Sequence, residues 1–187
     1  MKSRLMCALI LLSLLPCWAV ACDGLEVYAS LHHWNTINSE GNGKTLRLKG
    51  DVMRGLGVGL PLDDHFTLNG ECLFGDPSTT LSPGSNTTAD MMMFGVNLDY
   101  KIREENGPAG SLSPYVTAGL GTMNFNQDVV GGIDEWDMSY SLGAGIYWNM
   151  PGSVFLKFAY RWVWVDMDVT DSMELFDGVS LGVGMYF

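Results

Sequence analysis

The strongest constraint on the fold of this chain is a two-residue alternation in its C-terminal half. Over residues 179–187, one phase holds the large apolar side chains Val179, Leu181, Val183, Met185 and Phe187. The other phase holds glycine, serine and one tyrosine, and residues 138–149 and 154–165 alternate in the same way. Successive side chains of a β-strand point to opposite faces, so these segments are predicted strands with one large apolar face.

Eight segments of the chain carry strand patterning, and none shows a convincing helical period. They are residues 25–35, 46–60, 66–74, 91–102, 115–124, 138–149, 154–165 and 179–187. Two connections are tight turns (61–65 and 149–153), and a third is a Gly/Pro/Ser linker of moderate length (103–114). They alternate with four connections that are longer or more polar (36–45, 75–90, 125–137 and 166–178). This rhythm predicts an all-β fold, an eight-stranded antiparallel up-and-down transmembrane β-barrel.

The two faces of the strands distinguish a membrane barrel from a soluble one. The interior of an eight-stranded barrel is just filled by side chains, which suits the small or charged phase. The large phase then faces outward, where only lipid tolerates it, and the predicted location is a bacterial outer membrane. A soluble barrel or sandwich with an apolar interior is the alternative, although glycine-rich outer faces would weaken its strands.

Aromatic residues near the strand ends fit the same interpretation, because amphipathic rings collect where lipid headgroups meet the hydrocarbon. One belt would hold Tyr100, Trp148 and Phe187, and the other Trp34, Trp136 and Trp164.

The N-terminus has the pattern of an export signal. Two basic residues precede an apolar run that is too short for a transmembrane helix, and an Ala-Val-Ala sequence follows it. Residues 1–21 are therefore predicted to be a signal peptide, and residues 22–187 the barrel. Lipidation of Cys22 and a disulfide between Cys22 and Cys72 are alternatives that the sequence leaves open.

The composition limits the classes of partner. The 187 residues suit one domain and contain 10 Lys and Arg against 21 Asp and Glu, a formal net charge of −11. So acidic a chain is not expected to bind nucleic acid, because contact with phosphates requires basic side chains. A hydrophobic content of 47% argues against disorder.

Two segments carry a resemblance to a known family. Residues 114–121, Pro-Tyr-Val-Thr-Ala-Gly-Leu-Gly, resemble the fifth strand of the outer-membrane β-barrel superfamily, which includes opacity-type porins and the barrels of OmpA-like proteins. The ending at Tyr186 and Phe187 resembles the terminal signal that the barrel assembly machinery reads. The resemblance implies an integral outer-membrane barrel, and we expect no cell-wall-binding domain beside it.

The inward phase contains candidate functional residues. Glu71, Asp99, Lys157 and Arg161 fall in this phase, with Asn69 and Asn97 nearby. Charges inside a narrow barrel are expected to pair, because an isolated charge is costly away from water. A closed plug of salt bridges is the favoured interpretation, and a gated ion path is the alternative.

Other candidate sites have simpler explanations. The connection 166–178 contains the carboxylates Asp166, Asp168, Asp171, Glu174 and Asp177, but it lacks the pattern of a Ca²⁺-binding loop. We therefore expect a solvated acidic loop, no metal and no cofactor. The basic side chains that could meet lipopolysaccharide phosphates are Lys44, Arg47, Lys49 and Arg54.

Enzyme activity is not expected. Some small barrels modify lipid A and need a nucleophile beside a histidine base. His32 lies two positions from Ser30 on the same face and His33 follows it, but no family signature surrounds them, and His65 falls in a turn. The sequence predicts a monomeric structural or surface-display barrel whose partners are outer-membrane lipids, lipopolysaccharide and the assembly machinery. A narrow pore and a lipid A-modifying enzyme are the alternatives.

Overall fold

The computed structural model describes residues 24–41, 44–82, 86–88, 90–102, 110–126, 134–167 and 172–187. Among these residues, no helix is long and apolar enough to cross a membrane. The predicted signal peptide and Cys22 lie outside the described residues.

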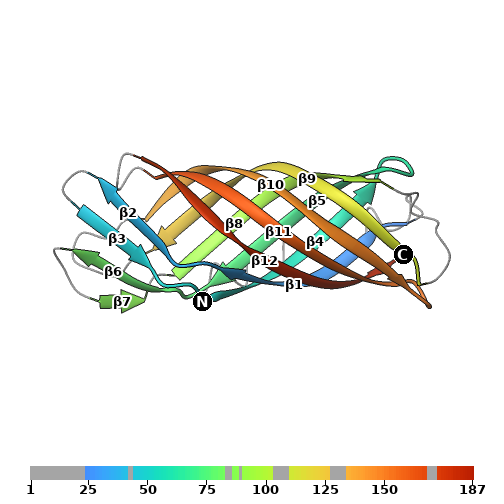
Figure 1. Ribbon diagram of the computed structural model, residues 1–187, viewed down its shortest axis with the longest axis horizontal. Coiled ribbons are helices and arrows are strands. Elements are labelled where there is room, and N and C mark those ends of the chain that lie inside the picture. The colour runs from blue at the N-terminus through green and yellow to red at the C-terminus, as the bar shows by residue number, and fades with distance from the viewer. Residues whose placement is uncertain are drawn as a thin grey trace.

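Eight strands close into an antiparallel barrel in the order β1-β12-β11-β10-β9-β8-β5-β4 (Figure 1). Closure joins the first strand to the last, with Glu26 opposite Tyr186 and Trp34 opposite Gly178. The predicted all-β, eight-stranded antiparallel barrel is confirmed. The strands are β1 (Glu26–Trp34), β4 (Val52–Pro61), β5 (Phe66–Gly75), β8 (Asp90–Lys101), β9 (Leu112–Asn126), β10 (Asp134–Met150), β11 (Val154–Met167) and β12 (Ser172–Tyr186).

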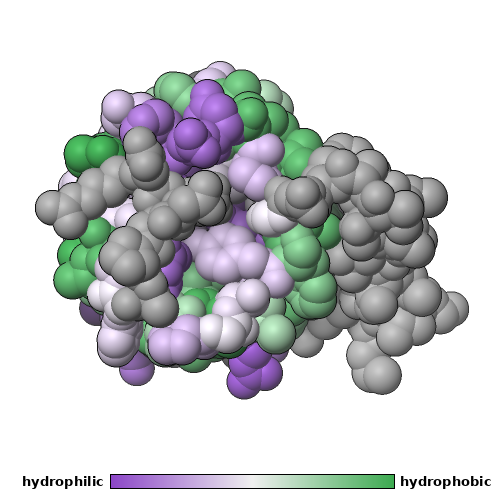
Figure 2. Space-filling view, turned by 90° about the vertical axis from the view of Figure 1, so that its right-hand side faces the viewer, coloured by the Kyte–Doolittle hydropathy of each residue, from purple (hydrophilic) through white to green (hydrophobic). Residues whose placement is uncertain are grey.

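The alternation in the sequence becomes the two surfaces of the barrel wall. The side chains of Leu142, Leu181 and Val183 point outward and are each about half exposed, whereas the glycines between them point inward. Figure 2, which looks along the barrel, shows hydrophobic residues around the wall. The inward glycines leave room for large rings: a Cβ at Gly57 would lie 2.2 Å from Cζ of Tyr28, which is directly opposite in the register.

A second sheet extends beyond one end of the barrel. It has the order β2-β3-β6-β7 and appears at the left of Figure 1. Its strands are β2 (Ile37–Gly41), β3 (Lys44–Leu48), β6 (Ser78–Ser82) and β7 (Asn86–Thr88). The connections predicted at 36–45 and 75–90 are therefore partly strands, and we call this end of the barrel the loop end and the opposite end the turn end.

The predicted single strand over 46–60 is wrong, because the chain bends at residues 49–51 and divides it into β3 and β4. At the bend the backbone passes very close to the end of β1. A Cβ at Gly50 would lie only 2.6 Å from the carbonyl oxygen of Trp34, and Gly50 N–H donates to Oγ1 of Thr36 at 3.1 Å. Glycine permits this approach, and the bend directs β3 away from the barrel.

The connection predicted over 166–178 is also mostly strand. β11 continues to Met167 and β12 begins at Ser172, with Val165 opposite Glu174. The hydrogen-bonded pairing of β11 with β12 extends beyond the part of the two strands that shows the hydrophobic alternation. Three of the predicted loop carboxylates therefore belong to strands: Asp166, Glu174 and Asp177. Asp168 and Asp171 lie outside the described residues.

The turn end is formed by tight connections and by the closure of β12 on β1. In the turn between β4 and β5, Asp63 Oδ1 accepts hydrogen bonds from the backbone N–H of His65 at 2.8 Å and of Phe66 at 2.7 Å. These two bonds hold the pKa of Asp63 below its usual value. In the turn between β10 and β11, Gly152 and Ser153 both have positive φ, 83° and 62°.

The lumen has two layers rather than the uniformly small or charged interior that the sequence suggested. Toward the turn end it is polar and aromatic. Toward the loop end it is a hydrophobic core, which we call the apolar layer. Trp34 belongs to this layer and is 5% exposed, so its predicted place in an outer aromatic belt is wrong. The members of the apolar layer are Trp34, Ile37, Leu48, Met53, Leu73, Met91, Met93, Met123, Phe125, Val163, Val165, Met167 and Phe176.

Candidate functional site in the barrel lumen

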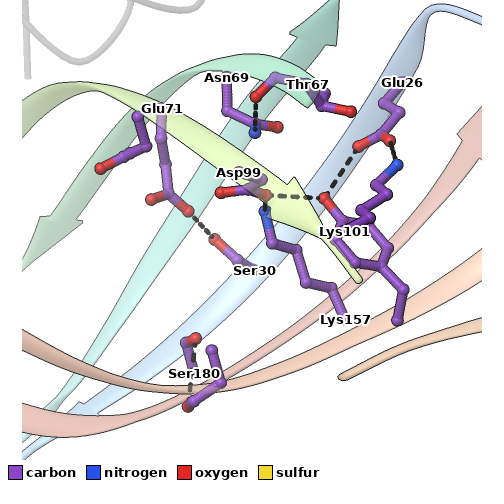
Figure 3. A network of polar contacts seen from close by, with 12 residues as sticks. Glu26, Ser30, Thr67, Asn69, Glu71, Asp99, Lys101, Lys157 and Ser180 are labelled. Atoms are coloured by element: carbon purple, nitrogen blue, oxygen red, sulfur yellow. Dashed lines mark hydrogen bonds and ion pairs between the residues drawn. The ribbon is translucent and has the colours of Figure 1, made fainter. Parts of the chain in front are cut away.

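The structure places all four charged residues predicted for the lumen inside the barrel, and it joins them in two ion pairs. Arg161 Nη1 lies 2.5 Å from Glu71 Oε2, and Lys157 Nζ lies 2.5 Å from Asp99 Oδ2. Figure 3 shows the Lys157 and Asp99 side chains pointing toward each other between the strands. Each pair spans the lumen, because β11 supplies both cations and β5 and β8 supply the carboxylates.

Glu71 is the centre of the first group. Its Oε1 accepts a hydrogen bond from Ser30 Oγ at 3.0 Å and lies 3.1 Å from His32 Nε2. Arg161 also donates from Nη2 to Oδ1 of Asn97 at 3.3 Å. Contacts from several strands therefore hold this one carboxylate, which is 8% exposed.

Asp99 is the centre of the second group, nearer the turn end. The Tyr147 hydroxyl lies 2.9 Å from Asp99 Oδ2 and 3.3 Å from Glu26 Oε2. Glu26 also accepts a hydrogen bond from Lys101 Nζ at 2.8 Å, and both residues are almost fully buried. Sequence reasoning missed this third ion pair between β1 and β8, which Figure 3 shows beside Asp99.

Asn69 does not join either group directly, although it is buried as predicted. Its Nδ2 donates to the carbonyl oxygen of Thr67 at 3.3 Å, and its Oδ1 has no partner among the described residues. Beside Arg161 lies a cavity of about 20 Å³, lined also by Tyr28, Ser30 and Tyr115. A cavity of that size holds about one water molecule, and the Nε of Arg161 has no hydrogen-bond partner among the described residues.

The charges of the three pairs balance, with three carboxylates facing three cations. Pairing compensates part of the cost of removing such charges from water. The groups therefore form a neutral plug across the turn-end half of the lumen, and the apolar layer fills the half above it.

Ser30 and His32 do meet, but inside the lumen. His32 Nε2 lies 3.1 Å from Ser30 Oγ, and the same nitrogen lies 3.1 Å from Glu71. In a catalytic triad the carboxylate holds the other ring nitrogen, which leaves Nε2 to accept the serine proton. His32 is 2% exposed, and no group of three or more His, Cys, Asp or Glu in the described ranges could hold a metal ion.

The basic side chains that could meet lipopolysaccharide phosphates lie on the outer surface near the loop end, as far as the structure describes them. Arg47, Lys49 and Arg54 are exposed, and Arg54 lies opposite Leu31 in the outward phase of the wall. The side chain of Lys44 lies outside the described residues.

These features are those of a membrane barrel, and the comparison with known families agrees. Residues 6–187 match the family of the outer membrane protein beta-barrel domain. This chain belongs to that family. It is a protein of the bacterial outer membrane, and the exposed apolar wall is its lipid-facing surface.

Solved outer-membrane barrels share the fold. Neisserial surface protein A superposes with a TM-score of 0.63 at 17% identity, over 88% of this chain and 97% of that chain. The N-terminal barrel of Pseudomonas aeruginosa OprF gives 0.59 at 15% identity, over 88% and 98%. The outer membrane protein AlkL, studied in lipid bilayers, gives 0.53 at 15% identity, over 89% and 92%. No curated protein matches this chain.

The two residues of the predicted assembly signal complete the barrel wall. Phe187 is 63% exposed on the lipid-facing side, and its backbone N–H donates to the carbonyl oxygen of Leu25 at 2.9 Å. Tyr186 is half-buried, and its hydroxyl donates to Oδ1 of Asn149 at 2.9 Å.

Proposed function

We propose that this protein is a closed, non-enzymatic outer-membrane barrel that presents a rigid β-sheet at the cell surface. The observation that carries the proposal is the sheet β2-β3-β6-β7, which two separate connections build together. β3 and β6 pair from residues 45 to 48 and from 79 to 82, so the two connections form one hydrogen-bonded unit. Binding functions on such scaffolds reside in their connections.

Contacts with the barrel support a rigid surface. Ile37 of β2 is 8% exposed and Leu48 of β3 is 4% exposed, and both pack in the apolar layer. The backbone N–H of Lys49 donates to the carbonyl oxygen of Ser78 at 2.9 Å, which continues the pairing toward the barrel. A preformed sheet loses less conformational entropy on binding than free loops would.

The plug argues against a pore. The lumen holds three ion pairs below a hydrophobic core, and the cavity beside Arg161 has room for about one water molecule. The Ser30–His32 geometry argues against a lipid-modifying enzyme, because a lipid acyl chain outside the barrel wall does not reach a buried histidine.

Lipopolysaccharide is the proposed lipid partner. Arg47, Lys49 and Arg54 would meet its phosphates if the loop end faces outward, because charged side chains near the membrane surface cost little there.

Tyr186 and Phe187 are the proposed recognition signal for the barrel assembly machinery, and the protein is proposed to be a monomer. Deletion of Phe187 is expected to lower the amount of barrel in the membrane, and unchanged levels would contradict that role.

The orientation and the display role are tested by labelling intact cells with a membrane-impermeant maleimide. In a Cys72→Ala background, Arg47→Cys on the sheet is expected to react, while Asp64→Cys in the turn between β4 and β5 is not. Both positions are exposed, so they form a matched pair. Labelling of Asp64→Cys alone would overturn the orientation.

Closure is tested separately in planar lipid bilayers with the intact protein. The expected result is no conductance steps above background, and discrete steps that Arg161→Met alters would replace the proposal with the pore alternative.

A further inference from the structure

The apolar layer is rich in methionine. Five of its thirteen members are methionines, and each is at most 4% exposed. They come from four strands, β4, β8, β9 and β11. These residues are Met53, Met91, Met93, Met123 and Met167.

The strand register brings four of these methionines together. Met93 lies directly opposite Met123, and Met91 lies two residues before Met93 on the same face. Gly75 lies opposite Met91, and a Cβ at Gly75 would be 2.9 Å from Cγ of Met53. The Met53 side chain therefore occupies the space over Gly75, beside Met91.

Two aromatic side chains surround Met53 on its other side. His32 lies directly opposite Met53 in the register, and both side chains are buried in the lumen. The indole Nε1–H of Trp34 donates to the sulfur of Met53 at 3.1 Å. The rings of His32 and Trp34 are stacked, with their centroids 5.9 Å apart. The indole of Trp34 therefore contacts the Met53 sulfur, and the register places Met53 between His32 on the adjacent strand and Met91 two strands away, at the boundary between the two layers.

We propose that this cluster is a binding site for a soft monovalent cation, Cu(I) or its analogue Ag(I). Thioether sulfur selects such ions over hard cations, and imidazole also binds copper. Met53 and Met91 would supply the sulfur ligands, and His32 would supply Nδ1, because its Nε2 contacts Ser30 and Glu71. The site is independent of the display function.

The test uses the intact protein purified from outer membranes into detergent, with Ag(I) as a redox-stable probe. Cys22→Ser and Cys72→Ala are introduced first, because thiolates would compete for the metal. The methionine methyl groups are labelled with ¹³C and followed by NMR during an Ag(I) titration. Shifts are expected for Met53 and Met91, while the lipid-facing Met138 and Met185, 51% and 46% exposed, stay unchanged.

Matched variants measure the affinity. Met53→Leu/Met91→Leu is expected to weaken Ag(I) binding by about tenfold or more, whereas Met138→Leu/Met185→Leu leaves it unchanged. Leucine has nearly the volume of methionine, and heat-modifiable migration on a gel confirms that each variant is folded. Three results would overturn the proposal: equal shifts in both sets of methionines, no shift in the inward set, or equal affinity of the two double variants. Each would mean that the inward methionines only fill the apolar layer.

Discussion

Along β1, the inward-facing residues change from Glu26, Ser30 and His32 to Trp34 as the chain passes from the turn end to the loop end. The neighbouring strands change in the same way, from Asp99 to Met93 in β8 and from Arg161 to Val165 in β11. The two halves of the lumen share strands and inward phase, but ion pairs fill one, whereas the other is mainly apolar, with Asp137 of β10 buried opposite Met123. They are expected to respond differently to substitution.

The polar half should be sensitive to the loss of one partner, and this is the largest effect that we expect. Arg161→Met leaves Glu71 buried without its cation, which should lower the free energy of unfolding by about 3–5 kcal/mol. Urea-induced unfolding in lipid vesicles, followed by tryptophan fluorescence, measures the change.

The matched control also removes the charge of Glu71, which Arg161→Met leaves without its cation. Arg161→Met/Glu71→Gln should recover part of the lost stability, because replacing both members of a buried ion pair is much less costly than replacing one. A double variant that is less stable than Arg161→Met would show that charge is not the cause.

The apolar half should instead respond to lost volume. Met123 is fully buried, and Met123→Ala should lower the free energy of unfolding by about 2–5 kcal/mol by leaving a cavity. Met123→Leu conserves the volume and should lower it by less than about 1.5 kcal/mol. The same unfolding experiment compares the two variants, and equal losses would break the contrast between the halves.

A single hydroxyl tests whether the polar half depends on its hydrogen bonds. Tyr147→Phe removes the donor between Asp99 and Glu26, and it should lower the free energy of unfolding by about 1.5–3 kcal/mol, as for a hydrogen bond to a charged group. Tyr140→Phe is the control, because Tyr140 faces outward and is 44% exposed. Equal effects of the two substitutions, measured by unfolding in vesicles, would mean that ring packing alone matters at Tyr147.

The sequence predicted the barrel well because lipid requires a large apolar outer face on every strand. The charges of the polar half were also predictable, since Glu71, Asp99, Lys157 and Arg161 are charged residues in the phase opposite to the large lipid-facing one. The Glu26–Lys101 pair was missed although Lys101 shares the inward phase of Asp99, because each residue lies next to the end of a predicted strand, where the boundary between strand and turn is least certain.

The apolar layer and the second sheet were hidden for different physical reasons. In the run Met91-Met92-Met93-Phe94 both phases are large and apolar, so the alternation does not reveal which side chains point inward. The strands β3 and β6 are short and polar, and each lies in a different connection. Their pairing is a long-range contact that local periodicity does not encode.

The turn between β4 and β5 lies outside both halves and should give the smallest effect. The hydrogen bonds from His65 and Phe66 hold the pKa of Asp63 in the folded protein below its pKa in the unfolded chain. Ionised Asp63 therefore stabilises the fold when the pH is above the unfolded pKa. This contribution is lost as the pH falls through the folded pKa. Asp63→Asn cannot titrate. The stability difference between the wild type and Asp63→Asn, measured by unfolding in vesicles from neutral to acidic pH, should therefore shrink as the pH falls. A difference that stays constant would show that this turn contributes through its geometry and not through its charge.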